Sequence, residues 1–383
     1  MALDHETFEQ LRDTVRRFVR ERLMPAEDRV EAEDEVPPEL IQEMRDLGLF
    51  GLSIPEEYGG LGLTVFEETE VIFEVTQAAL AFRSVFGTNV GIGSQGIVID
   101  GTAAQKRHYL PKLASGEMIA SFALTEPEAG SDAASLKTVA VADGSDYVLN
   151  GTKRYITNAP RAGIFTVMAR TDPASKGAGG ISAFIVPAAT PGLGLGKPDR
   201  KMGQRGTKTC DVIFQDARVP AEAIIGGIPG QGFKTAMKVL DRGRLHVAAM
   251  ASGMAQRMLD LALAYALERR QFGQPIAEFQ LIQGMLADSQ AELYAARSML
   301  RDAARRCDGG EAIAMEAACC KYFATEMAGR VADRAVQIHG GAGYMADYKI
   351  ERFYRDVRLL RIYEGTSQIQ QIVIARSMLR RLV

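Results

Sequence analysis

The chain has 383 residues, 47% of them hydrophobic, and is long enough to bury two or three sizeable cores. A formal net charge of −3 gives no electrostatic basis for nucleic-acid binding. We expect no membrane span and a cytoplasmic location, because no uninterrupted apolar run approaches the length that a bilayer needs and the N-terminal segment carries acids at Asp4 and Glu6 instead of the apolar stretch of a signal peptide.

The first region, from residue 7 to about residue 116, has a largely helical pattern. Apolar residues recur near its start at three- and four-residue spacing: Phe8, Leu11, Val15, Phe18 and Val19. This spacing predicts an amphipathic helix with one apolar face. Pro37-Pro38 then opens a second predicted helix, and Gly48 follows its expected end.

The middle region, about residues 119–225, is rich in glycine, proline, threonine and β-branched residues and predicts a small β domain. Asn150-Gly151 separates two runs of strand-forming residues, 147–149 and 152–157. Because Asn-Gly readily adopts the positive φ angles of a type I′ turn, this pattern predicts a hairpin. Further strands are predicted at residues 165–168, 182–186 and 210–214.

Beyond residue 232 the pattern returns to long amphipathic helices with Ala, Leu and Met on their faces. It is broken near residues 272–275 and again near residues 308–310, where Gly and Pro interrupt it. We therefore expect four or five helices packed as a bundle.

One glycine motif in this region fits the Gly-x-Gly-x-x-Gly/Ala pattern of dinucleotide sites, with Gly341, Gly343 and Ala346 at its fixed positions. The preceding residues, 312–338, predict a long helix, whereas a Rossmann unit needs a strand there. We therefore reject a Rossmann site. The glycines are better explained by a close backbone approach to a neighbouring subunit or a cofactor.

Near the C-terminus, residues 361–370 place one carboxylate, Glu364, at a Gly-Thr-Ser turn between two helical stretches. A glutamate in such a turn is able to remove a proton from carbon if the site desolvates it, because burial raises the pKa of a carboxyl group toward the working pH. The alternative is a carboxylate at a helix start, stabilised by the following backbone N–H groups. The motif alone leaves both interpretations open.

No metal site is expected from the histidines and cysteines. The histidines lie far apart, without metal-ligand spacing: His5, His108, His246 and His339. The cysteines contain no Cys-x-x-Cys spacing: Cys210, Cys307, Cys319 and Cys320. Because the adjacent pair cannot easily form a disulfide, we expect free buried thiols.

Four segments follow one another along the chain: 124–132 (LTEPEAGSD), 155–158 (YITN), 337–341 (QIHGG) and 361–370 (RIYEGTSQIQ). In sequence and in order they resemble the flavin-dependent acyl-CoA dehydrogenases, and the resemblance covers nearly all of the chain. It implies a mainly α fold with a central β domain. The expected domains are an N-terminal helical domain at 1–118, a β-barrel at 119–225 and a C-terminal four-helix bundle at 226–383.

The resemblance also implies an activity. In this family the residue at the position of Glu364 removes the α-proton of an acyl-CoA thioester, while the β-hydrogen leaves as hydride to FAD and gives the trans-2-enoyl-CoA. Relatives stabilise the enolate with the backbone N–H of that glutamate and a flavin ribityl hydroxyl. Electrons are then expected to pass to electron-transfer flavoprotein. A homotetramer is expected, with a dimer as the alternative.

Site residues are carried over from the family position by position. The resemblance assigns FAD contacts to Phe122, Leu124, Thr125, Ser131, Tyr155, Thr157, Arg269, Gln271, Phe272, Gln280, Gln337, Gly340, Gly341, Thr366 and Gln368. It assigns acyl-CoA contacts to Ser131, Asp241, Arg244, Tyr363, Gly365 and Arg376. Tyr155 stands where many relatives have Trp, and this chain has no Trp at all. The residues from Arg269 to Phe272 are expected to reach the pyrophosphate from a neighbouring subunit, because a guanidinium suits phosphate geometry.

Two positions bear on the base and on the substrate. Gly243 stands where some family members carry their base, so Glu364 is the base candidate that this pattern leaves. Phe82-Arg83-Ser84 resembles the segment of glutaryl-CoA dehydrogenase whose Arg binds the distal carboxylate of the substrate, although Thr76 stands where that relative has an acid. The alternative for Arg83 is a local ion pair, for example with Glu74.

Rival functions remain beside the dehydrogenase. An acyl-CoA oxidase or a flavin monooxygenase of the same fold would react with oxygen instead of passing electrons onward. Monooxygenase relatives often lack the glutamate, so Glu364 argues against them but not against an oxidase. A non-catalytic scaffold would have lost its flavin contacts, whereas Thr125, Ser131, Thr157 and Gln337 are all present.

Overall fold

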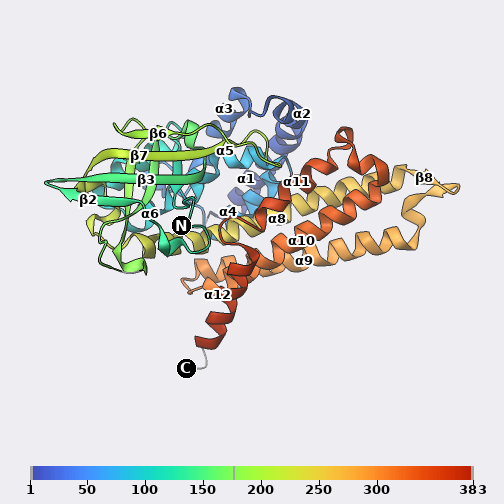
Figure 1. The fold of residues 1–383 in the computed structure, drawn as a ribbon. Coiled ribbons are helices and arrows are strands. Elements are labelled where there is room, and N and C mark those ends of the chain that lie inside the picture. The colour runs from blue at the N-terminus through green and yellow to red at the C-terminus, as the bar shows by residue number, and fades with distance from the viewer. Residues whose placement is uncertain (1–2, 176, 381–383) are drawn as a thin grey trace.

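The computed structural model describes residues 3–175 and 177–380, and its helices and strands form three parts in chain order (Figure 1). A group of helices comes first, a twisted sheet follows, and a set of long helices completes the chain. This order confirms the predicted fold class of a mainly α protein with a central β domain.

The N-terminal part contains seven α-helices: α1 (His5–Phe18), α2 (Met24–Glu33), α3 (Pro38–Asp46), α4 (Val65–Val75), α5 (Leu80–Val90), α6 (Gln95–Asp100) and α7 (Ala103–Ala114). The Asp4 side chain caps α1 by accepting from the backbone N–H of Thr7 at 2.9 Å. Helix α1 then continues through one π-helical turn, Val19–Leu23, into α2. The sequence pattern did not predict α2. The core between these helices includes Phe50, Phe82 and Phe86.

The middle part is one seven-stranded sheet: β1 (Ala120–Ala123), β2 (Val139–Asp143), β3 (Asp146–Thr157), β4 (Ile164–Arg170), β5 (Ile181–Pro187), β6 (Leu193–Leu195) and β7 (Thr209–Pro220). The strand order is β1-β4-β2-β3-β7-β6, and β5 pairs with β4. Within the described residues β1 and β6 do not pair with each other. The expected barrel is therefore a curled half-barrel, and its inner face packs Phe165, Phe184 and Phe214 into a core.

The predicted hairpin at Asn150-Gly151 is wrong, because β3 runs straight through these residues. The Asn150 side chain instead exchanges two hydrogen bonds with Asp216 of β7, at 2.9 and 3.0 Å. The β3–β7 register shifts between Leu149 and Gly151, which marks a bulge. The turn lies six residues earlier, between β2 and β3, where Gly144 has a φ of +63°.

The C-terminal part has five helices: α8 (Gly232–Glu268), α9 (Gln280–Asp308), α10 (Ala314–His339), α11 (Ile350–Leu360) and α12 (Ser367–Arg380). Helices α8, α9 and α10 form an elongated bundle, and a short hairpin of β8 (Arg270–Gln271) and β9 (Gln274–Pro275) lies at its far end from the sheet (Figure 1). Helix α12 extends away from the body of the molecule.

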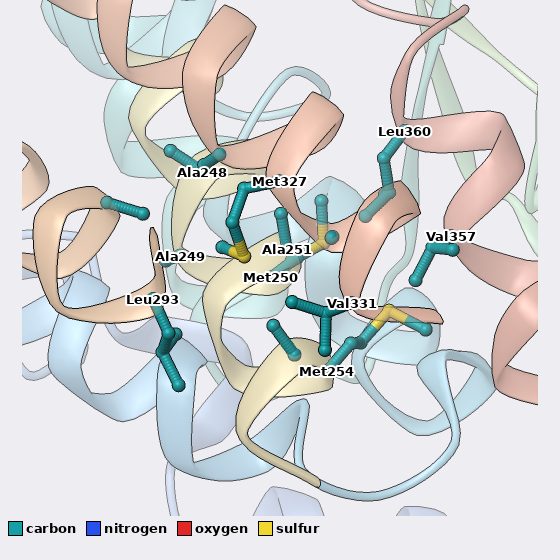
Figure 2. Close-up of a cluster of buried hydrophobic side chains, with 14 of the residues drawn as sticks. Ala248, Ala249, Met250, Ala251, Met254, Leu293, Met327, Val331, Val357 and Leu360 are labelled. Carbon is teal, nitrogen blue, oxygen red and sulfur yellow. The ribbon is translucent and has the colours of Figure 1, made fainter. Parts of the chain in front are cut away.

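Small side chains allow the bundle helices to approach closely. Alanines and methionines of α8, such as Ala251 and Met254, face Met327 and Val331 of α10 (Figure 2). Leu293 of α9 and residues of α11 close the same cluster. Such interdigitated packing holds the helices in one relative position, and with them any residue mounted on them.

Helix α8 connects all three parts of the molecule. At its start, a Cβ on Gly232 would overlap the backbone of β5 at Ser182 and Ala183. Further along, a Cβ on Gly253 would overlap the backbone of Phe73 in α4. Glycine at both positions therefore permits contacts that any side chain would block.

No described helix is long and apolar enough to cross a membrane. Nor do His, Cys, Asp and Glu residues gather anywhere in residues 3–175 and 177–380 in groups of three or more that could hold a metal ion.

Candidate functional site

Glu364 lies in the turn that connects α11 to α12. Its backbone has a φ of +52°, and the following Gly365 has a φ of +88°. A left-handed conformation is costly for a residue with a side chain and persists only where surrounding contacts hold it. The side chain is half-buried, and its Oε2 atom is buried without a hydrogen-bond partner in the described part of the chain. An unpaired buried carboxylate oxygen is free to accept a proton.

The carbonyl groups of the turn are held from two helices. Lys321 of α10 donates from Nζ to the carbonyl oxygen of Gly365 at 2.7 Å. Gln370 of α12 donates from Nε2 to the same oxygen at 3.0 Å and to the Glu364 carbonyl at 3.2 Å. These contacts fix the conformation that points the Glu364 side chain inward.

Gly243 of α8 makes room for the carboxylate. A Cβ at Gly243 would overlap Oε2 of Glu364 and would lie 3.7 Å from Cγ2 of Ile92. The absence of a side chain at position 243 therefore leaves the volume that the Glu364 carboxylate occupies.

Arg83 of α5 approaches the same region without a carboxylate partner. It is only 9% exposed, and its Nη2 lies 3.5 Å from Nδ1 of His246 on α8. Glu74, suggested from the sequence as its local partner, instead binds Arg16 at 2.6 Å, so that pairing is wrong. Across residues 3–175 and 177–380 no acid lies within ion-pair distance of Arg83, and its Nε makes no hydrogen bond.

His246 links Arg83 to a buried carboxylate. Its Nε2 lies 3.1 Å from Oε2 of Glu68, which also accepts from Arg242. Burial alone would raise the pKa of Glu68, but the Arg242 guanidinium and the His246 imidazole hold it at about 2. Glu68 is therefore ionised and already neutralised by Arg242, so Arg83 remains the cation without a direct counter-ion.

Tyr363 faces this space from the residue before Glu364. Burial, together with the Glu364 carboxylate, raises the pKa of Tyr363 well above its usual value, whereas the Arg83 guanidinium opposes the increase. Gln204 hydrogen-bonds to the tyrosine side chain and also contacts Asp356 of α11. Tyr363 and Glu364 therefore share one desolvated space with Arg83.

Asp241 and Arg244 stand on α8 beside Gly243. Nη1 of Arg244 donates to Oδ1 of Asp241 at 2.5 Å, and Nε of Arg244 is buried without a partner among the described atoms. Burial raises the pKa of Asp241, and the Arg244 charge opposes this. Both predicted substrate residues thus lie one or two positions from the glycine that faces the base.

The ends of β1 and β3 come together on the other side. Ser121 of β1 donates to the carbonyl of Thr157 at 2.7 Å, and the Arg154 backbone N–H donates to the carbonyl of Thr125 at 2.8 Å. Tyr155 has a φ of +59°, and the residue is 60% exposed. Phe122 at the end of β1 and Leu124 just after it are half-buried. This edge presents an aromatic face with two threonine side chains beside it.

A buried ion pair supports this edge from below. Lys153 donates from Nζ to Oε1 of Glu126 at 2.7 Å and to the carbonyl of Leu124 at 3.2 Å. Glu126 also accepts from the backbone N–H groups of Lys137 and Thr138. Burial lowers the pKa of Lys153 to about 8, although Glu126 opposes the shift.

Residues 84–93 connect the strand edge to the turn. Asn158, next to Thr157, donates to the carbonyl of Ser84 at 2.8 Å and to the Thr88 hydroxyl at 3.0 Å. At the other end of this segment Ile92 contacts the Gly243 position beside Glu364. The strand edge and the carboxylate therefore flank one common segment.

A second cluster of predicted residues lies elsewhere. Arg269, Gln271, Phe272, Gln280, Gly340 and Gly341 line a pocket of about 1010 Å³ beside the β8–β9 hairpin. Arg269 follows Gly243 by 26 residues along one helix, a separation of about 39 Å at the α-helical rise. Within one chain the structure does not bring this pocket to Glu364.

The remaining predicted residues are dispersed. Ser131 is exposed in the loop after β1, and Gln337 is exposed on α10 outside the pocket lining. Thr366 and Gln368 stand at the start of α12, where the Thr366 hydroxyl accepts from the Ile369 backbone N–H at 3.2 Å. Arg376 is exposed nine residues into α12, about 14 Å along its axis.

The β1–β3 edge and the pocket beside the β8–β9 hairpin offer side chains that suit different parts of FAD, the cofactor that the resemblance implies. The exposed ring of Tyr155 offers a stacking face, and Thr125 and Thr157 offer hydroxyls for the polar edge of a flavin. At the distal pocket, Arg269 offers a guanidinium suited to phosphate. The pocket wall adds Tyr265 stacked on His339 with ring centroids 4.4 Å apart. The side chains at the Tyr155 edge therefore fit the flavin ring of FAD, and those of the distal pocket fit its pyrophosphate and adenosine.

Sequence reasoning missed the residues that hold the site together: Lys321, Gln370, His246, Gln204 and Lys153. One of them carried a signal. Lys321 interrupts the apolar run of residues 317–324, and a lysine inside such a run is unusual unless it has a specific contact.

Comparison with known protein families gives three consecutive matches. The N-terminal, middle and C-terminal domain models of acyl-CoA dehydrogenase match residues 5–117, 121–217 and 230–379. A probable acyl-CoA dehydrogenase of Bacillus subtilis is 44% identical over 97% of this chain and 98% of its own length.

Two solved structures extend the likeness to the fold. Butyryl-CoA dehydrogenase from Megasphaera elsdenii has a TM-score of 0.94 at 36% identity, covering 99% of this chain and 100% of that one. A glutaryl-coenzyme A dehydrogenase in complex with glutaryl-CoA has a TM-score of 0.94 at 35% identity, covering 99% of this chain and 96% of that one.

Proposed function

The chain belongs to the acyl-CoA dehydrogenase family, and on that basis we propose that it oxidises an acyl-CoA thioester to the trans-2-enoyl-CoA with Glu364 as the base. As a family member it is an oxidoreductase with FAD as its cofactor. The observation that supports Glu364 most strongly is its buried, unpaired Oε2 in a turn whose carbonyls are fixed by α10 and α12.

Two groups of the same residue would act on the substrate. The Glu364 carboxylate would take the proton from the α-carbon. That proton is too weakly acidic for a carboxylate unless the developing enolate oxygen is stabilised. The backbone N–H of Glu364 donates to no acceptor in residues 3–175 and 177–380, so it is available to the thioester carbonyl. When bound, FAD supplies the acceptor for the hydrogen and electron pair that leave the β-carbon.

The residues that would hold FAD come from two copies of the chain. Phe122, Leu124, Thr125, Tyr155 and Thr157 would surround the flavin ring of one copy. Arg269, Gln271 and Phe272, with Gly340 and Gly341, would bind the pyrophosphate and adenosine of a cofactor held by the other copy. Arg269 lies roughly 39 Å along α8 from Gly243, which faces Glu364, so one copy does not bring its own hairpin pocket to its own reactive site. We accordingly propose a homo-oligomer, with a homotetramer as the expected form and electron-transfer flavoprotein as the electron acceptor.

A second candidate substrate class is a dicarboxylyl-CoA such as glutaryl-CoA. Arg83 supports it, because a buried guanidinium without a carboxylate partner is costly unless a ligand supplies one. One similar structure is a glutaryl-coenzyme A dehydrogenase with its substrate, which agrees with this reading. Thr76 departs from that relative, since its hydroxyl donates to the carbonyl of Ile72 and no acid stands there.

Anaerobic titration of the purified holoprotein with a panel of acyl-CoAs tests the proposal. Straight-chain, branched and dicarboxylyl thioesters are added in turn while the absorbance of oxidised flavin is followed. Bleaching by one class establishes dehydrogenation and identifies the substrate. Fast reoxidation by oxygen with release of peroxide would instead identify an acyl-CoA oxidase. Retention of colour with every thioester, despite bound FAD, would contradict the proposed reaction.

A further inference from the structure

Lys321 is a fully buried lysine in the middle of α10. Its exposed fraction is 0%, and its neighbours along the helix include Ala317, Ala318 and Ala324. Its ammonium donates to the carbonyl oxygen of Gly365, next to Glu364, at 2.7 Å. In the described part of the chain no carboxylate lies within 4.0 Å of this ammonium. A buried cation without a paired acid is uncommon, so its place beside the base requires an explanation.

The charges around Lys321 come from three elements. Glu364 lies in the turn, Arg244 faces it from α8, and Glu326 stands on α10 itself. Burial lowers the pKa of Lys321 to about 8, Arg244 adds to this, and the carboxylates of Glu364 and Glu326 oppose it. The Glu364 carboxylate therefore favours the charged form of the Lys321 ammonium.

Gln370 shows that geometry alone does not require a lysine. Its amide already donates to the carbonyls of both Glu364 and Gly365. A neutral side chain at position 321 would leave those two hydrogen bonds in place. What Lys321 adds is a fixed positive charge inside the apolar bundle, where charges interact more strongly than in water.

We propose that Lys321 is a positioning residue for the base: its ammonium holds the Gly365 carbonyl, keeps Glu364 in its left-handed conformation and attracts the Glu364 carboxylate electrostatically. This inference rests on the proposed role of Glu364. The proton that Glu364 takes from the substrate stays on its carboxylate, and Lys321 takes no part in the transfer.

The test compares three substitutions of Lys321 in the flavin-loaded protein. Lys321→Met removes donor and charge at nearly constant length, Lys321→Gln keeps a neutral donor, and Lys321→Arg keeps the charge. Flavin bleaching is followed over a range of concentrations of the identified acyl-CoA, which gives the limiting rate and KM. Flavin content and thermal unfolding report whether each variant has folded.

For Lys321→Met we expect a loss of about 100-fold in the limiting rate, because a base displaced by about 1 Å reacts that much more slowly. KM should change little, because no acyl-CoA contact is removed. Lys321→Gln should show a smaller loss, and Lys321→Arg, which keeps a charged donor, should restore most of the limiting rate.

Lys153→Met provides a matched control, because Lys153 is equally buried but pairs with Glu126 beneath the strand edge. Its loss of activity should parallel its loss of bound flavin, whereas Lys321→Met should lose rate per bound flavin. If Lys321→Met fails to bind flavin, the limiting rate of Lys321→Gln tests the proposed role of Lys321 instead.

A limiting rate of Lys321→Met within threefold of the unmodified protein, or a Lys321→Arg variant no faster than Lys321→Gln, would overturn the role of Lys321. A fully active Glu364→Gln variant would overturn the proposed function instead. The two failures are therefore distinguishable.

Discussion

The Glu364 turn is held by contacts within one chain, whereas the pocket beside the β8–β9 hairpin is left open by one chain. At the turn, α8, α10 and α12 of one chain fix both carbonyls and clear the volume for the carboxylate. At the pocket, Phe272 is 94% exposed and Leu281 85%. Large apolar side chains gathered at one end of a molecule are typical of a surface that a partner covers. The reactive end is thus preorganised by one copy, whereas in the proposed homo-oligomer a second copy would complete the dinucleotide end.

The largest effect is expected from Glu364→Gln at the preorganised end. The amide keeps the size of the side chain but cannot take a proton. We expect flavin and acyl-CoA binding to persist and the rate of bleaching to fall by about 10³-fold, roughly 4 kcal/mol in the barrier. Stopped-flow absorbance under anaerobic conditions measures this. Near-normal turnover would refute the assignment of the base.

Gly243→Ala should act on the same end more weakly. The added Cβ would overlap Oε2 of Glu364, which is the free end of a flexible side chain, so the carboxylate shifts while the fold stays intact. We expect a loss of about 100-fold in the limiting rate with thermal stability nearly unchanged.

Gly253→Ala on the same helix is the matched control for that variant. There the Cβ would meet the backbone of Phe73, which cannot move freely, so the melting temperature should fall. A Gly243→Ala protein that keeps full activity, or one that loses stability as Gly253→Ala does, would contradict the proposed use of this space.

Phe272→Ser tests the open end. If a second copy buries this ring, its loss should weaken assembly and FAD affinity by about 10- to 100-fold, since burial of a large side chain contributes roughly 1.5–3 kcal/mol. The rate per bound flavin should stay within about threefold, because the Glu364 turn is unaffected. Sedimentation at several protein concentrations and flavin titration measure the two effects.

Ile228→Ser, at an apolar residue 63% exposed outside the pocket, serves as the control. Equal behaviour of the two variants in both assays would show that the hairpin end has no special role in assembly.

Arg83→Met should give the smallest effect and concerns a contact that the preorganised end leaves open. If the guanidinium binds a distal carboxylate, KM for dicarboxylyl-CoA should rise by about 10- to 30-fold, the value of a hydrogen bond to a charged group. KM for an unbranched thioester of the same length should remain within about twofold. An equal change for both substrates would remove Arg83 from substrate selection.

Sequence reasoning predicted the order of the three parts and many elements, because helical and strand periodicities are local properties. The first helix at Phe8, Val15 and Phe18 and the strands near residues 165–168 and 182–186 are confirmed. The hairpin at Asn150-Gly151 failed because a turn rule cannot detect Asp216, which lies 66 positions away and binds Asn150 across two strands.

The candidate site divides in the same way. Glu364 was predicted because its motif is contiguous in the sequence. Lys321 stands 43 positions earlier and meets the turn only through helix packing, so periodicity assigned it to a helix without a role. Glu74 was offered as the partner of Arg83 from its proximity in sequence, yet it turns toward Arg16 of α1. Long-range contacts of this kind are fixed by tertiary structure.

Helix α8 has an implication for how freely its sequence can vary. Glycine is required at positions 232, 243 and 253 against β5, the Glu364 carboxylate and α4, respectively. Their intervals of 11 and 10 residues are close to three helical turns of about 10.8 residues, so all three lie on one stripe of the helix. A saturation mutagenesis map of α8 should therefore show positions that do not tolerate substitution at intervals of three turns. Substitutions at position 243 should be rejected only when variants are selected for turnover, whereas those at positions 232 and 253 should be rejected by a selection for folding alone.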